Sequence, residues 1–381
     1  MLLEMMPHPI GETTSGYNER ITDSTRNMTD IVQGEDRLPP RVAESRLLEI
    51  AVGIPGQQIM AMSLGRAQAA EKIAADRPDA SVTCWYLDSF HAALAKEHVT
   101  PLGNLAIECL VDWPEQACDL VLLPLSMRGE TELARDLLQT AYCRLTVGGW
   151  LIASVDNPKD QWLHEQMKVF DKSVKVRIFD DATVYLVQKK HELKRVRDFS
   201  CELDFRDSGH SIKIVTRPGV FSHREVDNGA RQLLDAVDVF PEARLLDIGC
   251  GSGSVAIALA ARDSTCQVLA VDSNARAVWC TRRGSELNGL ENLQVELNHS
   301  GAFNHPDAFD MALANPPYYA DFRIAELFIT SAIASLRPEG RLVIVTKQPK
   351  WYEENAGKWL DALEIFPSRK YFIASGTKPK F

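Results

Sequence analysis

The feature that most constrains this chain is an internal repeat. The stretch Asp119-Leu-Val-Leu-Leu is matched by Asp310-Met-Ala-Leu-Ala, 191 residues further on (310 minus 119). The stretch Leu145-Thr-Val-Gly-Gly is matched by Leu336-Arg-Pro-Glu-Gly at the same spacing (336 minus 145). An ungapped register that runs across a strand, a helix and a glycine turn predicts two copies of one fold in tandem.

Both copies alternate short apolar runs with helical patterns. In the first copy we expect strands at 58–62, 81–88, 107–111, 119–123 and 150–154, and helices at 66–75 and 131–145. In the second copy we expect strands at 244–248, 267–271, 293–297, 310–314 and 341–346. Short buried strands that alternate with helices are typical of a doubly wound, mostly parallel sheet. The expected fold class is therefore α/β, with two tandem Rossmann-like domains.

The repeat divides the chain of 381 residues into four parts. Residues 1–40 are polar and carry no apolar period, which predicts a flexible extension. We expect the first domain at 41–190, a basic linker at 191–210 and the second domain at 211–381. The stretch 189–197 holds five positive charges in nine residues, and the two runs on either side of Asp207-Ser-Gly209 can pair as a hairpin.

Composition places the chain among globular proteins, with 45% hydrophobic and 25% charged residues. No apolar run approaches the ~20 residues that cross a bilayer, and Met1-Leu-Leu-Glu4 does not resemble a secretory signal, so we expect a cytosolic protein without membrane contact. The eight cysteines have no C-x-x-C spacing, which argues against a zinc site. A net charge of −10 argues against a chain wrapped in nucleic acid but allows a local basic patch.

A glycine-rich turn stands at the start of the second copy. Asp247-Ile-Gly249-Cys-Gly251-Ser-Gly253 follows an expected strand and opens a helix at 255–261. Glycines at such a turn let the backbone approach a ligand closely. Nicotinamide- and flavin-binding folds use similar turns, so the turn alone leaves the ligand open. A second acid, Asp272, closes the next strand and is well placed for ribose hydroxyls.

The tetrapeptide Asn315-Pro316-Pro317-Tyr318 ends the fourth strand of the second copy, where a dehydrogenase would have no use for it. Together with the glycine turn it resembles the class I S-adenosylmethionine-dependent methyltransferases that modify amino groups. The upstream stretch 217–229 is similar to the P-G-V-F-S…D-x-G segment of the ribosomal RNA guanine-N2 methyltransferases. Those enzymes carry a duplicated domain whose first copy has lost its motifs, and the resemblance extends over 45–381.

This resemblance implies an enzyme that methylates the N2 amine of a guanine in ribosomal RNA of either subunit. It also implies S-adenosylmethionine as cofactor and S-adenosylhomocysteine as product, and methyl transfer from this donor needs no metal. Because the internal duplication already supplies a pair of folds, we expect a monomer. The Asn315 side-chain oxygen and the Pro316 carbonyl would accept the two amino hydrogens, and Tyr318 would stack on the base. The implied cofactor site comprises Asp247, Gly249, Gly251, Gly253, Asp272, Ser273, Asn298, Ser300 and Asn315, with Phe221 as a lid.

Both copies depart from the family pattern. After the third strand of the second copy no aspartate is present to accept a hydrogen bond from the adenine amine, so Asn298 or Ser300 would take that role. In the first copy one glycine, Gly65, remains in the turn, and Pro124-Leu-Ser replaces Asn315-Pro-Pro, while Asp88 is aligned with Asp272. We therefore expect the first domain to be degenerate and not catalytic, with an RNA-binding or structural role.

Two basic segments are candidates for RNA contact. The cluster Lys347-Gln-Pro-Lys350-Trp351-Tyr352 follows the last parallel strand, and the other candidate is the basic stretch 189–197. The acceptor itself has alternatives, because the Asn-Pro-Pro-Tyr motif also fits adenine N6 and the glutamine amide of a release factor. A ribosome-assembly factor that binds RNA is the alternative from another functional class.

Overall fold

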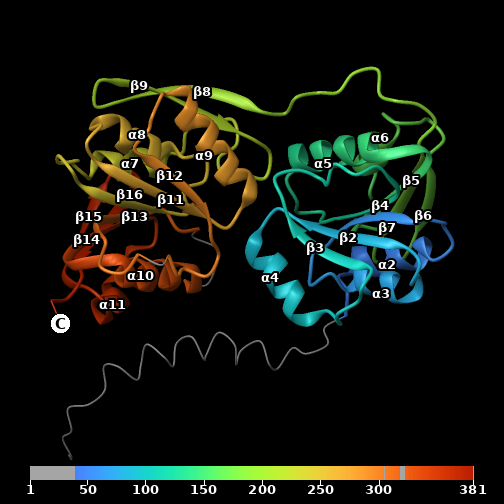
Figure 1. Ribbon diagram of the computed structural model, residues 1–381, viewed down its shortest axis with the longest axis horizontal. Helices are drawn as coiled ribbons and strands as arrows, with labels where there is room; N and C mark the ends of the chain where they lie inside the picture. Colours follow the sequence, from blue (N-terminus) through green and yellow to red (C-terminus); the bar gives the residue numbers. More distant parts are fainter. Residues whose placement is uncertain (1–38, 304, 318–321, 381) are drawn as a thin grey trace, which may run out of the picture. The chain divides into compact units, whose positions relative to one another are not determined.

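The computed structural model describes residues 39–303, 305–317 and 322–380 (Figure 1). Within these residues the strands form two seven-stranded sheets and one two-stranded hairpin. The extension expected at 1–40 falls almost wholly outside the described residues, and Tyr318 does so too.

The two large sheets share one topology. The first has the order β3-β2-β1-β4-β5-β7-β6 and the second the order β12-β11-β10-β13-β14-β16-β15. Five strands of each sheet run parallel, and the last two in each order are antiparallel to their neighbours. The first sheet consists of β1 Gln58–Met62, β2 Ser81–Tyr86, β3 Leu105–Cys109, β4 Cys118–Leu125, β5 Leu145–Val155, β6 Lys175–Ile178 and β7 Thr183–Gln188. The second consists of β10 Arg244–Ile248, β11 Gln267–Asp272, β12 Leu293–Leu297, β13 Phe309–Ala314, β14 Leu336–Thr346, β15 Asp361–Ser368 and β16 Tyr371–Thr377.

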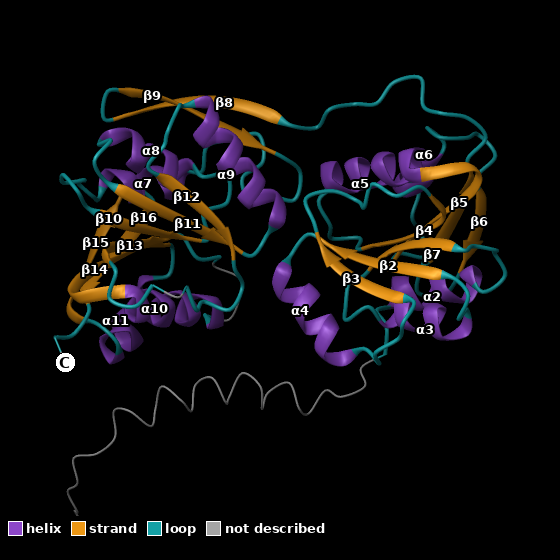
Figure 2. Ribbon diagram, viewed as in Figure 1, coloured by secondary structure: helices purple, strands orange, loops and turns teal. Residues whose placement is uncertain are grey.

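Helices cover both faces of each sheet (Figure 2). Successive strand residues face opposite sides, so Leu245 packs in one core with α8 and Leu246 packs in another with α10. The first domain contains α2 Val42–Ala51, α3 Gln68–Asp76, α4 Ser89–His98, α5 Thr131–Arg144 and α6 Trp162–Met167. The second contains α7 Asn228–Asp235, α8 Ser254–Arg262, α9 Ala275–Leu287, α10 Arg323–Ser335 and α11 Pro349–Asn355. Among the described helices none is long and apolar enough to cross a membrane.

The expected repeat is confirmed by the strand bounds. β5 and β14 have the same length and begin 191 residues apart (336 minus 145). Upstream the spacing is 186 residues, both between β1 and β10 (244 minus 58) and between β2 and β11 (267 minus 81). The α/β fold with two tandem Rossmann-like domains is therefore the observed one. The same spacing upstream aligns the first turn's Ser63, Gly65 and Ala67 with the three glycines of the second.

One part of the sequence alignment is wrong. We expected Asp88 to match Asp272, but β2 ends at Tyr86, which is the residue that stands where Asp272 ends β11. Asp88 matches Asn274 instead, and both are N-caps: the side-chain oxygen of each accepts hydrogen bonds from two backbone N–H groups of the following helix. The first domain thus has no acid at the end of its second strand.

The expected hairpin is confirmed. β8 Cys201–Asp207 pairs with β9 His210–Thr216 in antiparallel register. Phe205 on β8 and Ile212 on β9 are buried in one core with α7 and α8 of the second domain. The boundary expected between 210 and 211 would separate these paired strands, so we propose that the second domain begins at Cys201.

Candidate active site

The glycine turn lies between β10 and α8. Gly249, Gly251 and Gly253 have φ angles of +75°, +56° and +79°, a left-handed conformation that other residues rarely adopt. Neighbouring side chains also leave no room at two of the three positions: a Cβ on Gly249 would lie 2.9 Å from the Phe328 ring, and one on Gly253 would lie 2.7 Å from the Thr281 methyl group. Gly249 and Gly253 are therefore required by both backbone conformation and space, and Gly251 by backbone conformation alone.

Two carboxyl groups support this turn in different ways. Asp247 on β10 is 3% exposed and accepts a hydrogen bond from the Ala256 N–H (3.1 Å), so it holds the first turn of α8 from beneath. Burial raises the pKa of Asp247 to about 7. Asp272 at the end of β11 is half-buried and accepts from the Gly251 N–H (2.9 Å) and the Asn274 N–H (2.8 Å). Burial raises the pKa of Asp272 to about 6 in spite of these hydrogen bonds.

Asn315 lies at the same edge of the sheet as the glycine turn. It follows β13 directly, and Ala314 of β13 pairs with Ile248 of β10, the residue before Gly249. The side chain of Asn315 is half-buried, and its Nδ2 donates to Asp227 Oδ2 over 2.7 Å. Pro316 is buried next to it. The structure therefore brings Asn315 and Pro316 to the end of the sheet where the glycine turn lies.

Asp227 is a site residue that sequence reasoning did not single out. It is the N-cap of α7, and its Oδ2 also accepts from the Ala230 N–H at 2.7 Å. A Cβ on Gly229 would lie 2.8 Å from that oxygen and 3.2 Å from both atoms of the Asn315 amide. The sequence Asp227-Asn-Gly229 could have indicated this role. An aspartate can cap the helix that begins there, and a glycine two residues later leaves space beside its carboxylate.

The segment before Asp227 exposes an aromatic ring. Phe221 is 58% exposed, so it is not a core residue, and its expected function as a lid stays a prediction. Val220 beside it is buried against Ala277 and Cys280 of α9. The backbone at Gly219 is held on both sides, because its carbonyl accepts from Asn274 Nδ2 (2.8 Å) and its N–H donates to Glu130 of the first domain (2.9 Å).

The loop after β12 is organised by Asn298. Its Oδ1 accepts from the N–H groups of Ser300 (2.9 Å) and Gly301 (3.2 Å), and its Nδ2 donates to the Ala302 carbonyl (3.0 Å). Ser300 is exposed. This turn explains why an asparagine is present, and the expected hydrogen bond from an adenine amine to Asn298 or Ser300 stays a prediction.

Side chains of the first domain contact the second beside the expected cofactor residues. Asp88 Oδ2 accepts from Ser273 Oγ at 2.6 Å, and the Ser89 N–H donates to the Ser273 carbonyl at 2.8 Å. The Ala275 N–H donates to the Leu87 carbonyl at 2.8 Å. Ser273, a predicted cofactor residue, is therefore anchored by the first domain.

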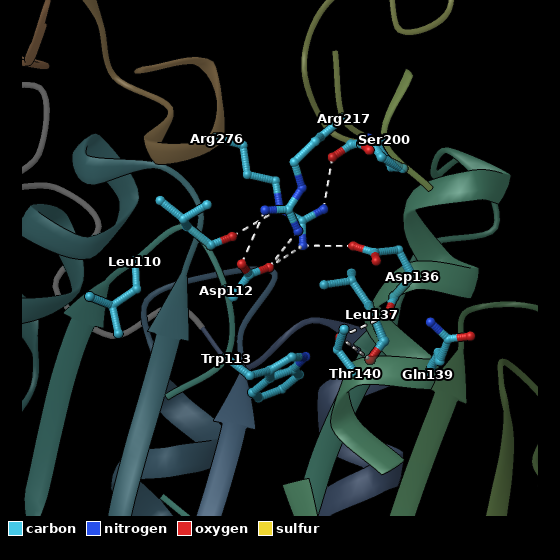
Figure 3. A network of polar contacts seen from close by, with 12 residues as sticks. Leu110, Asp112, Trp113, Asp136, Leu137, Gln139, Thr140, Ser200, Arg217 and Arg276 are labelled. Atoms are coloured by element: carbon cyan, nitrogen blue, oxygen red, sulfur yellow. Dashed lines mark hydrogen bonds and ion pairs between the residues drawn. The ribbon is translucent and has the colours of Figure 1, made fainter. Parts of the chain in front are cut away.

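A buried ion-pair network extends this contact (Figure 3). The Arg276 side chain is fully buried and lies 2.7 Å from Asp136 Oδ2 and 3.3 Å from Asp112 Oδ1. Its guanidinium also donates to the Val111 carbonyl (2.9 Å) and, from Nη1, to the Pro218 carbonyl (2.8 Å). Desolvation by burial lowers the pKa of Arg276, against the effect of Asp136.

First-domain carboxylates also hold the segment that carries Phe221. The Arg217 guanidinium makes a two-pronged contact with Asp112 at 3.0 and 2.5 Å. Glu132 accepts from Arg224 Nε and Nη2, both at 2.8 Å, and lies 3.3 Å from His223 Nε2. Although burial opposes it, Arg217 holds the pKa of Asp112 below its usual value.

The matching turn of the first domain is satisfied by its own chain. The buried Glu44 carboxylate accepts from Ser63 Oγ (2.7 Å) and from the Leu64 N–H. The Tyr86 hydroxyl donates to the Gly65 carbonyl (3.1 Å) from the position that an acid holds in the second domain. Backbone groups that face a ligand in a cofactor-binding turn are thus engaged by side chains here, which supports a first domain without a cofactor.

The two basic segments differ from expectation. Tyr352 is 2% exposed and belongs to the core under α10, so the expectation that it contacts RNA is wrong. The Trp351 ring stacks on Phe322, with 4.8 Å between the ring centres. Lys189 is 1% exposed, and its ammonium group donates to the Leu145 carbonyl at 2.7 Å instead of facing solvent. Lys350 remains well exposed.

In the described part of the chain no three His, Cys, Asp or Glu side chains gather as a metal site.

Residues 211–374 match the model of the methyltransferase small domain family. The ribosomal RNA small subunit methyltransferase C of Pseudomonas entomophila is 28% identical over 238 residues, which are 61% of this chain and 70% of that protein. The same protein of Chromohalobacter salexigens is 37% identical over 164 residues, 39% of this chain and 47% of that protein. For several of these curated relatives the match spans about half of their length.

A solved structure shares the two-domain fold. The Thermus thermophilus 16S rRNA N2 G1207 methyltransferase, solved with AdoMet and guanosine, superposes with a TM-score of 0.73 at 21% identity. The superposition covers 87% of this chain and 91% of that one. At this identity the superposition shows the fold alone: this chain has the duplicated two-domain fold that the resemblance to ribosomal RNA guanine-N2 methyltransferases implies.

Proposed function

We propose that this protein transfers a methyl group from S-adenosylmethionine to the N2 amine of a guanine in 16S ribosomal RNA. The observation that carries the proposal is the position of the Asn315 amide, which is held by Asp227 at the sheet edge where the glycine turn lies. The similarity of the second half to small-subunit rRNA methyltransferases supports 16S over 23S rRNA.

The residues at this edge fit the cofactor. Three left-handed glycines let the backbone approach the methionine part, and the half-buried Asp272 carboxylate faces the same turn, where ribose hydroxyls would donate to it. The adenine side of the cofactor is lined in this proposal by Ser273, Asn298 and Ser300. Phe221 covers the ligand, and Asp247 supports the glycine turn from beneath. When bound, S-adenosylmethionine supplies a methyl group that its sulfonium has already activated.

The remaining task for the protein is to prepare the amine. A guanine N2 lone pair is delocalised into the ring, so the Asn315 Oδ1 and the Pro316 carbonyl would accept its two hydrogens and localise the lone pair on nitrogen. Pro316 and Pro317 keep this backbone rigid because proline fixes φ. Alignment of donor and acceptor can supply about 7–11 kcal/mol of barrier reduction. Tyr318 would stack on the base, which must first leave its helix.

The partner implied is ribosomal RNA or the small subunit, in the cytosol, with a monomeric enzyme and no metal in the chemistry. The first domain, 41–190 in our expectation, would serve as a structural or RNA-binding platform without catalysis. The basic linker and exposed Lys350 would contact phosphates, so binding should weaken as salt rises.

The test uses labelled S-adenosylmethionine with 30S subunits, naked 16S rRNA, 50S subunits and a release factor, followed by mass spectrometry of the labelled product. We expect N2-methylguanosine in 16S rRNA, and one cofactor bound per chain by calorimetry. Asn315→Ala should bind the cofactor as the wild type does and lose turnover by orders of magnitude. Label found in N6-methyladenosine, in methylglutamine or in 23S rRNA would show that the proposed acceptor is wrong. RNA binding without any methyl transfer would favour the alternative that the protein is a ribosome-assembly factor.

A further inference from the structure

We propose that Asp227 is a positioning residue that fixes the Asn315 side-chain amide in one of its two orientations, with the oxygen directed at the substrate amine. This inference rests on the proposed function, since it assigns a task to Asn315 Oδ1. It names a residue on α7 that contacts neither the glycine turn nor, in our proposal, the substrate.

The orientation of an asparagine amide decides its chemistry. Its two ends have nearly the same shape, but the oxygen accepts hydrogen bonds and the nitrogen donates them. A methyl acceptor amine must donate its hydrogens to the enzyme, so a rotated Asn315 would present a second donor and repel it. A rigid strand end does not by itself choose between these orientations.

Asp227 selects one of the two orientations of the Asn315 amide. An ionised carboxylate only accepts hydrogen bonds, so the contact of 2.7 Å between Asp227 Oδ2 and the amide is favourable only when Nδ2 faces it. A rotated amide would place two acceptor oxygens together at that distance. The contact therefore turns Oδ1 away from Asp227.

The carboxylate is itself held in place. The same Oδ2 accepts from the Ala230 N–H at 2.7 Å, which is the N-cap hydrogen bond of α7. The helix is anchored in turn, because Leu233 is fully buried and Gln232 accepts from Ser368 Oγ at 2.8 Å.

Gly229 leaves the space that the contact between Asp227 and Asn315 needs. A Cβ at this position would lie 2.8 Å from Asp227 Oδ2 and 3.2 Å from each end of the Asn315 amide. Any larger residue would have to push the amide and the carboxylate apart. The cap and the glycine are thus two independent features of α7 that serve one contact.

The central test exchanges the carboxylate for a group that caps the helix but does not select the orientation of the amide. In Asp227→Ser the cap survives, because serine caps helices about as well as aspartate does, but the hydroxyl of the new residue can donate to Asn315 as well as accept from it and no longer favours the orientation with Nδ2 facing residue 227. We expect kcat to fall about 100-fold, the scale seen when a single transition-state hydrogen bond is removed. Cofactor affinity and melting temperature should stay unchanged.

The rescue separates positioning from structure. Asn315→Asp alone places two carboxylates in contact and should lose most activity. In the double variant Asp227→Ser/Asn315→Asp the new hydroxyl accepts the cap hydrogen bond, donates to one oxygen of residue 315 and leaves the other oxygen as acceptor, so we expect at least tenfold more turnover than in Asn315→Asp. A merely structural role for Asp227 would make the double variant no better than either single one.

Asn228→Ala, at the exposed first residue of α7, is the matched control and should keep wild-type turnover. Gly229→Ala should lower kcat as Asp227→Ser does, with its melting temperature measured alongside. If the wild type methylates rRNA and Asp227→Ser keeps at least a third of its kcat, or if the double variant shows no rescue, the inference is overturned while the proposed function stands. If the wild type methylates no rRNA, or Asn315→Ala remains fully active, the proposed function fails and the inference with it.

Discussion

The guanidinium of Arg276 lies 2.7 Å from the carboxylate of Asp136, and this ion pair joins a fully buried side chain on α9 of the second domain to α5 of the first. It stands at the centre of the network in Figure 3. Arg276 also donates to the carbonyl of Pro218, which lies three residues before Phe221. The first domain therefore contacts the segment that leads to Asp227, although we assign it no chemistry.

Arg276→Met should destabilise the protein by about 3–5 kcal/mol, because it strands the buried Asp136 charge without a partner. Urea unfolding of the full chain measures this. The matched control is Arg283→Met on the same helix, whose ion pair with Glu286 is exposed and worth at most about 1 kcal/mol. Equal losses in the two variants would mean that the network of Arg276 contributes nothing beyond a surface pair.

The buried Asp247 carboxyl predicts a pH dependence of stability. Its folded-state pKa of about 7 lies above the ordinary aspartate value, so the folded state binds more protons than the unfolded one between about pH 4 and 7. The contribution of this group to stability therefore falls as the pH rises through that window. Asp247→Asn cannot titrate, and its melting temperature should decline less between pH 5 and 7 than that of the wild type.

Asp263→Asn is the control for this pH series. Hydrogen bonds from Thr265 lower the pKa of Asp263, so that group is ionised in both states from pH 5 to 7 and adds no slope there. A steeper decline in Asp247→Asn than in the wild type would contradict the assignment of the raised pKa to Asp247.

Glu132 offers a test of how the first domain serves the site. Its carboxylate holds Arg224 and His223, and Glu132→Gln should loosen this segment without unfolding the protein, because the pair is partly exposed. We expect several-fold weaker cofactor binding by calorimetry and faster amide exchange near Phe221. Glu165→Gln, which breaks an exposed pair with Lys168 elsewhere in the first domain, should change neither quantity.

The places of the glycine turn, Asp272 and Asn315 in the fold could be predicted from local motifs. The glycine turn and Asn315 directly follow a strand and Asp272 ends one, and the register of parallel strands brings these strand ends to one edge of the sheet. The contact between Asp227 and Asn315 was not predicted because it joins residues 88 positions apart through the placement of α7, which no local pattern specifies.

Other errors have equally specific causes. Asp88 was aligned with Asp272 because both are acids near the end of a second strand, and helix capping and ligand binding both favour an aspartate there. The strand bounds align Tyr86 with Asp272 instead. Charge and aromatic content marked Lys189 and Tyr352 as surface residues, but composition does not say which way a side chain faces. β15 was missed because Pro367 and acidic residues suit an edge strand, whose pattern is weak.

Phe221→Ala separates two explanations of an exposed aromatic ring. With 58% of its surface exposed, the side chain contributes little to the folded core, so the melting temperature should stay within about 1 °C of the wild type. If the ring covers the cofactor, its loss should raise the dissociation constant for S-adenosylmethionine by about tenfold, because a covering aromatic side chain contributes on the order of 1–2 kcal/mol. Phe240→Ala, at another exposed phenylalanine of the second domain, is the matched control and should leave that constant unchanged. An unaltered constant in Phe221→Ala would remove this residue from the cofactor site and leave it free to contact RNA.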